Sequence, residues 1–189
     1  MRRAFLKQLG GIAALTAAPR TFAQGGKPYR IYAVTWRGKT QVEKGLEDYF
    51  GKQGIAVEFI WRDAEQQAAR LAEFVAEIRQ LRPDLVYTWG TPPTLGIAGT
   101  QAAMNSGKFI TDIPVLFALV AAPVATGIVS SLASRSRDIT GVSHVAPLET
   151  QLEAIRTYRK FSKLGALYNA AEKNSVATAE ALRKLADAQ

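Results

Sequence analysis

The 189-residue chain has no cysteine, a single histidine and no long apolar run. Without cysteine it can form no disulfide and offers no thiolate or lipid-attachment site, so we expect the core alone to hold the fold. Metal sites usually combine several His, Cys, Asp or Glu ligands, and the lone His144 predicts none. The apolar segment at residues 9–18 is too short to span a bilayer, which takes about 20 apolar residues.

Signatures of catalysis and nucleotide binding are also missing. The chain contains no G-x-G-x-x-G, no G-x-x-x-x-G-K-[ST] and no G-x-S-x-G pattern. Asp63, Asp84 and Asp112 are interpreted as turn or cap residues and not as an acid–base pair. These absences favour a binding protein without catalytic residues or cofactors. A small α/β hydrolase that uses a serine with His144 as its base stays open as an alternative.

The first 23 residues have the order of an export signal. Residues 2–7 (RRAFLK) resemble the twin-arginine pattern R-R-x-F-L-K, an apolar stretch follows, and Thr21 and Ala23 fit a cleavage site. We therefore expect a soluble periplasmic protein cleaved near Ala23, with the general secretory route as the alternative. The signal carries four basic and no acidic residues, so the chain's net charge of +8 falls to +4 in the remainder. The remaining charges are interspersed, which argues against nucleic acid as a partner.

Beyond the signal, short apolar runs alternate with amphipathic segments. We expect strands at 30–35, 56–61, 84–89, 114–119 and 164–168, and helices around 42–54, 71–82, 92–107, 148–155 and 175–186. This alternation predicts an α/β fold with a parallel sheet and helices on both faces. The slack stretch at about 134–143 is the candidate crossing between an α/β lobe at 24–141 and the start of a second lobe at 142–189. The second lobe has too few elements for its own sheet, so the chain is interpreted as incomplete or naturally truncated.

The loops that follow the strands are the expected ligand site, because open parallel sheets bind ligands beyond the carboxyl ends of their strands. Gly90 and Thr91 lead into a helix N-terminus, where free N–H groups and the helix dipole favour a carboxylate. Thr91 could also cap that helix. Trp36 and Trp89 stand at adjacent loops and favour an aromatic or apolar ligand moiety, with ordinary packing as the alternative.

Several segments resemble one protein family. Residues 82–91 (RPDLVYTWGT) are similar to the "kPDvivt-x-gt" strand of ABC-transporter substrate-binding proteins related to tryptophan and aromatic amino-acid receptors. Residues 113–117 resemble its "iPiVf" strand, and residues 123–143 follow its "DPv…GlV.Sla…NiTGvS" segment. Residues 167–175 resemble the second-lobe pattern "lyN..e.nS". The resemblance covers nearly the whole chain after the export signal.

The resemblance implies a type I periplasmic-binding fold, with a nearly complete first lobe and a partial second lobe that would close on a solute. The implied ligand residues are Trp36, Trp89, Gly90, Thr91, Ala122, Pro123, Ser143, Asn169, Glu172 and Ser175. The implied partners are an amino-acid-like or aromatic carboxylate and an ABC permease in the inner membrane. Two departures stand out: Ala122 replaces the family's acidic residue, and full members continue past Gln189. A ligand-sensing input protein for a membrane signalling partner is the alternative.

Overall fold

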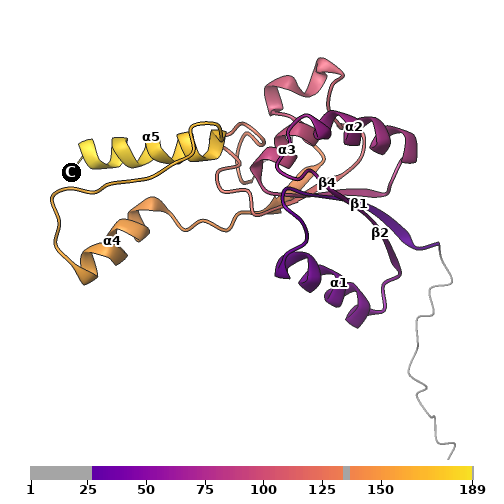
Figure 1. Ribbon diagram of the computed structural model, residues 1–189, viewed down its shortest axis with the longest axis horizontal. Coiled ribbons are helices and arrows are strands. Elements are labelled where there is room, and N and C mark those ends of the chain that lie inside the picture. Colours follow the sequence, from indigo (N-terminus) through magenta and orange to yellow (C-terminus); the bar gives the residue numbers. More distant parts are fainter. Residues whose placement is uncertain (1–26, 134–136, 189) are drawn as a thin grey trace, which may run out of the picture.

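A parallel β-sheet with helices on both faces forms the body of the protein (Figure 1). The computed structural model describes residues 27–133 and 137–188, so the expected export signal lies outside the described residues. The elements are β1 (Tyr29–Thr35), α1 (Gln41–Gln53), β2 (Val57–Asp63), α2 (Arg70–Leu81), β3 (Leu85–Trp89), α3 (Thr91–Ala98), η1 (Gln101–Ser106), β4 (Val115–Ala118), β5 (Ile139–Val142), α4 (Leu148–Tyr158) and α5 (Lys173–Asp187).

The five strands lie in the order β2-β1-β3-β4-β5, and each neighbouring pair is parallel. The chain leaves β1 toward β2 and then crosses to β3 on the other side of β1. This reversal makes the gap between the loops after β1 and β3 the topological switch point of the sheet. Ligands of open α/β sheets bind at such a point. The parallel sheet and its first four strands were predicted from the sequence and are confirmed.

Two hydrophobic clusters sandwich the sheet. On one face, α2 and α3 pack against Tyr32, Val34 and Val86. On the other face, α1 places Leu46 and Phe50 against a cluster around Tyr87. Figure 1 shows the same arrangement, with α1 on one side of the strands and α2 and α3 on the other. Side chains alternate between faces along each strand, so neighbouring residues of β1 and β3 enter different clusters.

Helix α1 begins and ends as its local sequence dictates. Thr40 and Glu43 form a reciprocal capping box at its N-terminus. Gly54 ends it in the left-handed region at φ 65°. Two glycines, Gly45 and Gly51, lie inside this helix with open space around them.

Replacing Gly51 with alanine is expected to raise the free energy of unfolding by about 0.5–1 kcal/mol, because alanine loses less backbone entropy in a helix. Gly51 lies in α1, and a Cβ added there would meet no atom within 4 Å. Urea unfolding followed by circular dichroism measures the change. Gly54→Ala is the matched control, since its positive φ makes the same substitution strained. Equal stabilisation by both substitutions would contradict the assignment of the helix end.

Two elements differ from the sequence prediction in the middle of the chain. The helix predicted over 92–107 breaks, because α3 ends at Ala98 and Gly99 turns the chain at φ 67° into the separate turn η1. The half-buried guanidinium of Arg137 donates to the carbonyls of Ala98, Gly99 and Ile128, which provides donors for the carbonyls at the buried C-terminal end of α3. Burial lowers the pKa of Arg137.

The fifth strand also lies elsewhere than predicted. Residues 139–142, expected in a crossing, form β5 beside β4, and the predicted boundary between 141 and 142 falls within this strand. Residues 164–168 form no strand, and Leu167 is fully exposed. A strand needs a neighbour for its backbone hydrogen bonds, and none of the described strands lies beside this segment. The apolar pattern alone was therefore an insufficient signal.

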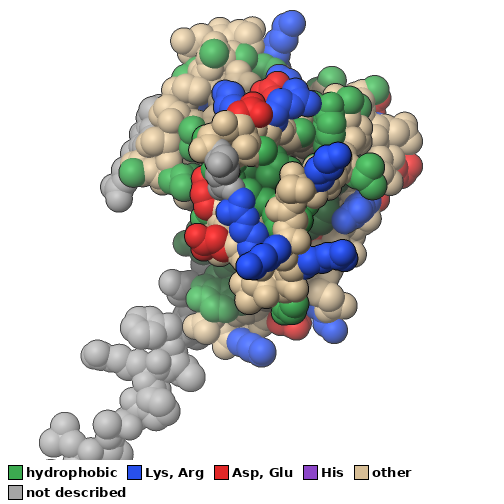
Figure 2. All heavy atoms as spheres, turned by 90° about the vertical axis from the view of Figure 1, so that its left-hand side faces the viewer, with side chains coloured by type: hydrophobic (Ala, Val, Ile, Leu, Met, Phe, Trp, Pro, Cys, Tyr) green, Lys and Arg blue, Asp and Glu red, His purple; other side chains and the backbone are tan. Residues whose placement is uncertain are grey.

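Helices α4 and α5 extend away from the sheet and lie against each other (Figure 1). Both helices were predicted, and Leu152 is the buried residue of α4. Viewed from the side on which α4 and α5 lie, the surface carries basic, acidic and hydrophobic side chains that are interspersed (Figure 2). None of the described helices is long and apolar enough to cross a membrane.

Candidate functional site

The carboxyl ends of four strands bring most of the predicted site residues to one edge of the sheet. Trp36 follows β1, the Trp89–Thr91 turn ends β3, and the Ala122–Pro123 turn comes after β4. Ser143 follows β5, and its hydroxyl donates to the carbonyl of Ala121 at 3.4 Å. The loops after β4 and β5 are therefore in direct contact.

The turn between β3 and α3 is fixed by hydrogen bonds on both sides. Gly90 has φ 87°, a conformation that favours glycine, and its N–H donates to the carbonyl of Ala118 at 2.8 Å. The buried hydroxyl of Thr94 donates to the carbonyl of Gly90 at 2.7 Å and lies 2.9 Å from the hydroxyl of Thr88. Gly90 itself occupies the N-cap, and no side chain caps α3. The predicted capping by Thr91 is therefore wrong, because Thr91 is the first residue inside the helix.

Two hydrogen-bond donors at this turn are buried without a partner. Thr91 is only 3 % exposed, and neither its hydroxyl nor the indole Nε1 of Trp89 forms a hydrogen bond. Most buried polar groups in proteins are hydrogen-bonded, since an unpaired one costs about 1–3 kcal/mol. The two donors lie on either side of Gly90, at the switch point of the sheet. Protein atoms cover both, so a ligand reaches them only when the surrounding loops move.

The N-terminus of α3 offers fewer donors than the sequence prediction assumed. Pro92 and Pro93 have no N–H, and the N–H of Thr94 donates to the carbonyl of Gly90. The backbone donor left in the first turn is the N–H of Thr91. Together with the Thr91 hydroxyl it forms a small pair of donors at the positive end of the helix dipole. A carboxylate has two oxygens and can accept a hydrogen bond from each of two donors.

Trp36 and Trp89 reach the same edge from opposite faces of the sheet. Trp36 packs against the cluster under α2 and α3, whereas Trp89 packs against the cluster on the α1 side. The guanidinium of Arg37 lies 5.3 Å from the centroid of the Trp89 ring. Sequence reasoning missed Arg37, which is exposed and places a positive charge beside the Trp89 ring.

Hydrogen bonds to its own carbonyls hold the loop after β4, which has Ala122 where the resembling family has an acidic residue. The carbonyl of Ala122 accepts hydrogen bonds from the N–H of Thr126 at 2.9 Å and from its hydroxyl at 2.7 Å. The carbonyl of Pro123 accepts from the N–H groups of Ile128 and Val129. The turn is thus held by backbone contacts, and it presents no charged side chain at Ala122.

The three predicted second-lobe residues cluster at the N-terminus of α5. The amide of Asn169 donates to the carboxylate of Glu172 at 3.3 Å, and Ser175 is half-buried in the first turn of the helix. Their hydrogen bonds are local. The neighbouring Asn174, which sequence reasoning did not select, holds a buried Oδ1 without a partner. Its place within the family-like pattern, between Glu172 and Ser175, was the available signal.

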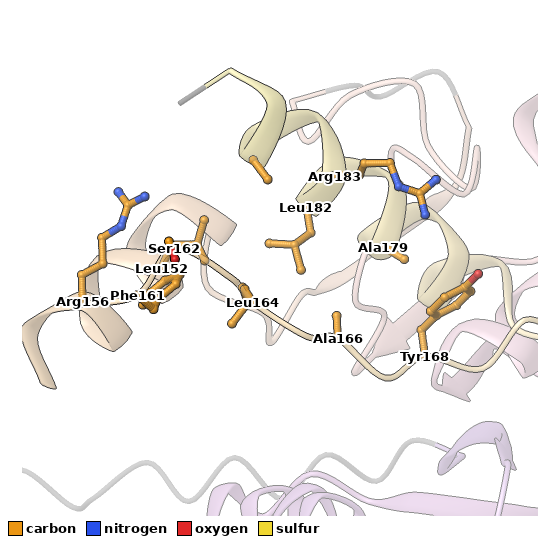
Figure 3. Close-up of a pocket in the computed structure, with 11 residues that line it drawn as sticks. Leu152, Arg156, Phe161, Ser162, Leu164, Ala166, Tyr168, Ala179, Leu182 and Arg183 are labelled. Atoms are coloured by element: carbon orange, nitrogen blue, oxygen red, sulfur yellow. The ribbon is translucent and has the colours of Figure 1, made fainter. Parts of the chain in front are cut away.

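Two hollows among the described residues lie away from this edge. A hollow of about 600 Å³ lies between α4 and α5, where Leu182 points from α5 toward the segment around Leu164 (Figure 3). Another of about 620 Å³ lies at the opposite end of the sheet, near Leu85, Leu116 and Thr140. Both hollows are lined mainly by residues that the predicted ligand site does not include. No group of His, Asp and Glu side chains within the described residues is suited to hold a metal ion, and His144 is exposed.

The profile of the family described as "ABC transporter substrate binding protein" matches residues 37–189. The chain belongs to this family. The match includes the β3–α3 turn, the loops after β4 and β5, and the α5 N-terminus. The resemblance inferred from the sequence and the predicted α/β fold class are both confirmed.

Known proteins resemble the chain in sequence and in fold. The chain is 29 % identical over 144 residues to a tyrosine-binding protein of Clostridioides difficile (strain R20291), covering 76 % of this chain and 39 % of the relative. A conserved domain protein of Vibrio cholerae has the same fold with a TM-score of 0.70 at 23 % identity. So does an ABC domain of Streptococcus pneumoniae solved in complex with L-Trp, with a TM-score of 0.68 at 24 % identity. These matches cover 86 % and 85 % of this chain, but the chain spans about half (54 %) of each solved relative.

Proposed function

We propose that the protein binds an aromatic or apolar amino acid in the periplasm, at the β3–α3 turn, and delivers it to an ABC permease in the inner membrane. The observation that carries this proposal is the pair of unpaired buried donors, Trp89 Nε1 and Thr91 Oγ1, at the switch point of the sheet. The family assignment supports a small-molecule substrate. Tyrosine and tryptophan enter as candidates through the printed descriptions of the relatives.

The ligand carboxylate would accept hydrogen bonds from the N–H and the hydroxyl of Thr91, with the dipole of α3 and the nearby charge of Arg37 adding attraction. The ligand's apolar side chain would lie against the indole of Trp89. Pro123 and Ser143 would border the same pocket from the loops after β4 and β5. The missing acidic group at Ala122 leaves the ammonium group to be held by other residues.

The segment around Asn169, Glu172, Asn174 and Ser175 would close over the ligand from the second lobe. Its unpaired Asn174 Oδ1 supplies an acceptor that suits an ammonium group. We place the hinge after β5, because residues 143–147 link the sheet to α4 without regular structure. Closure would shift the population toward the state that the permease recognises. The chain spans about half of each of the solved relatives.

Isothermal titration with L-tryptophan and L-tyrosine tests the proposal, and tryptamine and tyramine are the matched controls. These amines keep the ring and the amino group but lack the carboxylate. Since a hydrogen bond to a charged group is worth about 1.5–3 kcal/mol, we expect the amines to bind at least about tenfold more weakly than the amino acids. Equal binding of amines and amino acids would contradict the carboxylate site. Heat changes indistinguishable from buffer for all four compounds would contradict the proposed function.

A further inference from the structure

The carboxylate of Glu43 is completely buried beside the candidate site. Its exposed fraction is 0 %, and no described Lys or Arg forms an ion pair with it. Three donors surround it: the Thr40 N–H at 2.7 Å and the Thr40 hydroxyl at 2.6 Å on Oε2, and the Tyr87 hydroxyl at 2.5 Å on Oε1. A buried carboxylate is stable only when its oxygens accept hydrogen bonds. The contacts with Glu43 therefore restrict the positions of Thr40 and Tyr87.

The hydrogen bond between Glu43 and Tyr87 ties two parts of the site together. Glu43 and Thr40 form the N-terminus of α1, directly after the loop at residues 36–39. Tyr87 lies in β3, two residues before Trp89, and both side chains pack on the same face of the sheet. Burial and then the contact with Glu43 raise the pKa of Tyr87, so its hydroxyl stays protonated as a donor.

At its N-terminal end, the loop at residues 36–39 is hydrogen-bonded to the segment after β2. The carbonyl of Thr35 accepts a hydrogen bond from the N–H of Ala64 at 2.9 Å, and the carbonyl of Trp36 accepts from the N–H of Gln66 at 2.8 Å. Between these hydrogen bonds and those of Glu43, Arg37 extends over the ring of Trp89. The position of Arg37 over the Trp89 ring thus depends on both ends of the loop.

We propose that Glu43 is a positioning residue for ligand binding, which holds the loop at residues 36–39 over the β3–α3 turn through its hydrogen bond with Tyr87. This inference rests on the proposed function for its effect on affinity. The effect on the loop itself follows from the contacts alone. Glu43 touches no ligand in this account and acts through Trp36 and Arg37.

The chain contains a matched control on the opposite face of the sheet. Tyr32 is also buried and also donates to a glutamate, Glu77, at 2.5 Å. Burial likewise raises the pKa of Tyr32. Glu77 is also paired with Arg62, whereas Glu43 has no such ion pair among the described residues. Tyr87→Phe and Tyr32→Phe each remove a hydroxyl that donates to a glutamate, but only Tyr87 is joined to the loop beside the site.

The experiment compares Tyr87→Phe, Tyr32→Phe and Glu43→Gln in the full chain. Hydrogen exchange of the peptide covering residues 36–40 reports the loop, and calorimetric titration with L-tryptophan and L-tyrosine reports affinity. We expect Tyr87→Phe and Glu43→Gln to speed exchange in this peptide and to weaken binding by about tenfold, because binding sites require closely held geometry. Tyr32→Phe should leave both readouts at the wild-type level.

Equal affinity losses in the two tyrosine variants would overturn the inference, since the loss would then reflect general stability. Unchanged exchange at residues 36–40 in Tyr87→Phe would also overturn it. If the wild-type chain binds neither amino acid, the proposed function fails, and the exchange measurement alone decides whether Glu43 holds the loop. Faster exchange confined to Tyr87→Phe and Glu43→Gln would then still support the positioning contact.

Discussion

Thr91→Val is expected to weaken binding of the amino acid by about ten- to a hundredfold while leaving the protein as stable as the wild type or up to about 1 kcal/mol more stable. Valine has nearly the shape of threonine, and it removes a buried hydroxyl that has no partner in the unliganded protein. The substitution therefore does not lower the free energy of unfolding, whereas the ligand carboxylate loses one of its two hydrogen-bond donors. Calorimetric titration and urea unfolding measure the two effects on the same sample.

Thr94→Val is the control for the same chemical change three residues further along α3. The Thr94 hydroxyl is fully buried and bonded to the carbonyl of Gly90 and the hydroxyl of Thr88. Its loss removes the partner of the buried Thr88 hydroxyl and should cost about 1–3 kcal/mol of unfolding free energy. A destabilised Thr91→Val with unchanged affinity would show that the Thr91 hydroxyl has a structural partner and no ligand role.

Gly141→Ala should destabilise the protein by about 3 kcal/mol, near the upper end of the usual cost of overpacking. A Cβ at this position would lie 2.1 Å from the carbonyl oxygen of Phe117 and within 2.4 Å of its ring. Backbone atoms cannot yield cheaply, so β5 would have to separate from β4. Urea unfolding measures the loss.

Gly165→Ala provides the comparison, because a Cβ there meets nothing within 4 Å. It should change the unfolding free energy by less than about 0.5 kcal/mol, as is usual for exposed positions. A Gly141→Ala protein as stable as Gly165→Ala would contradict the close approach of β4 and β5. The same result would contradict the contact between Ser143 and the loop after β4.

The elements that the sequence predicted well are those whose signals are local. The first four strands are short apolar runs, and α1 has both a capping residue and a terminal glycine within its own sequence. Residues 139–142 lack such a run, and their strand depends on Gly141 fitting against Phe117, which lies far away in the sequence. Residues 164–168 show the reverse case, since an apolar run without a neighbouring strand stays irregular.

The candidate site was only partly predictable for a similar reason. The loops at the strand ends follow from the α/β pattern, but the face on which each tryptophan lies depends on strand register. Val34 is paired with Thr88, so these two side chains lie on the same face of the sheet. Trp36, two residues after Val34, follows that face, whereas Trp89, one residue after Thr88, lies on the other face. Glu43 was missed because a glutamate on an amphipathic helix usually faces water. The spacing of Thr40 and Glu43, which is that of a capping box, was the signal that could have identified it.

Nuclear magnetic resonance of the three tryptophan indoles during titration with L-tyrosine tests the central claim most directly. The indole N–H of Trp61 already donates to Glu47 at 3.0 Å, so it serves as the internal reference. We predict that the Trp89 indole and the Thr91 amide shift together and saturate, while the Trp61 indole stays in place. Shifts confined to the hollow between α4 and α5, with Trp89 and Thr91 unchanged at saturation, would contradict the account.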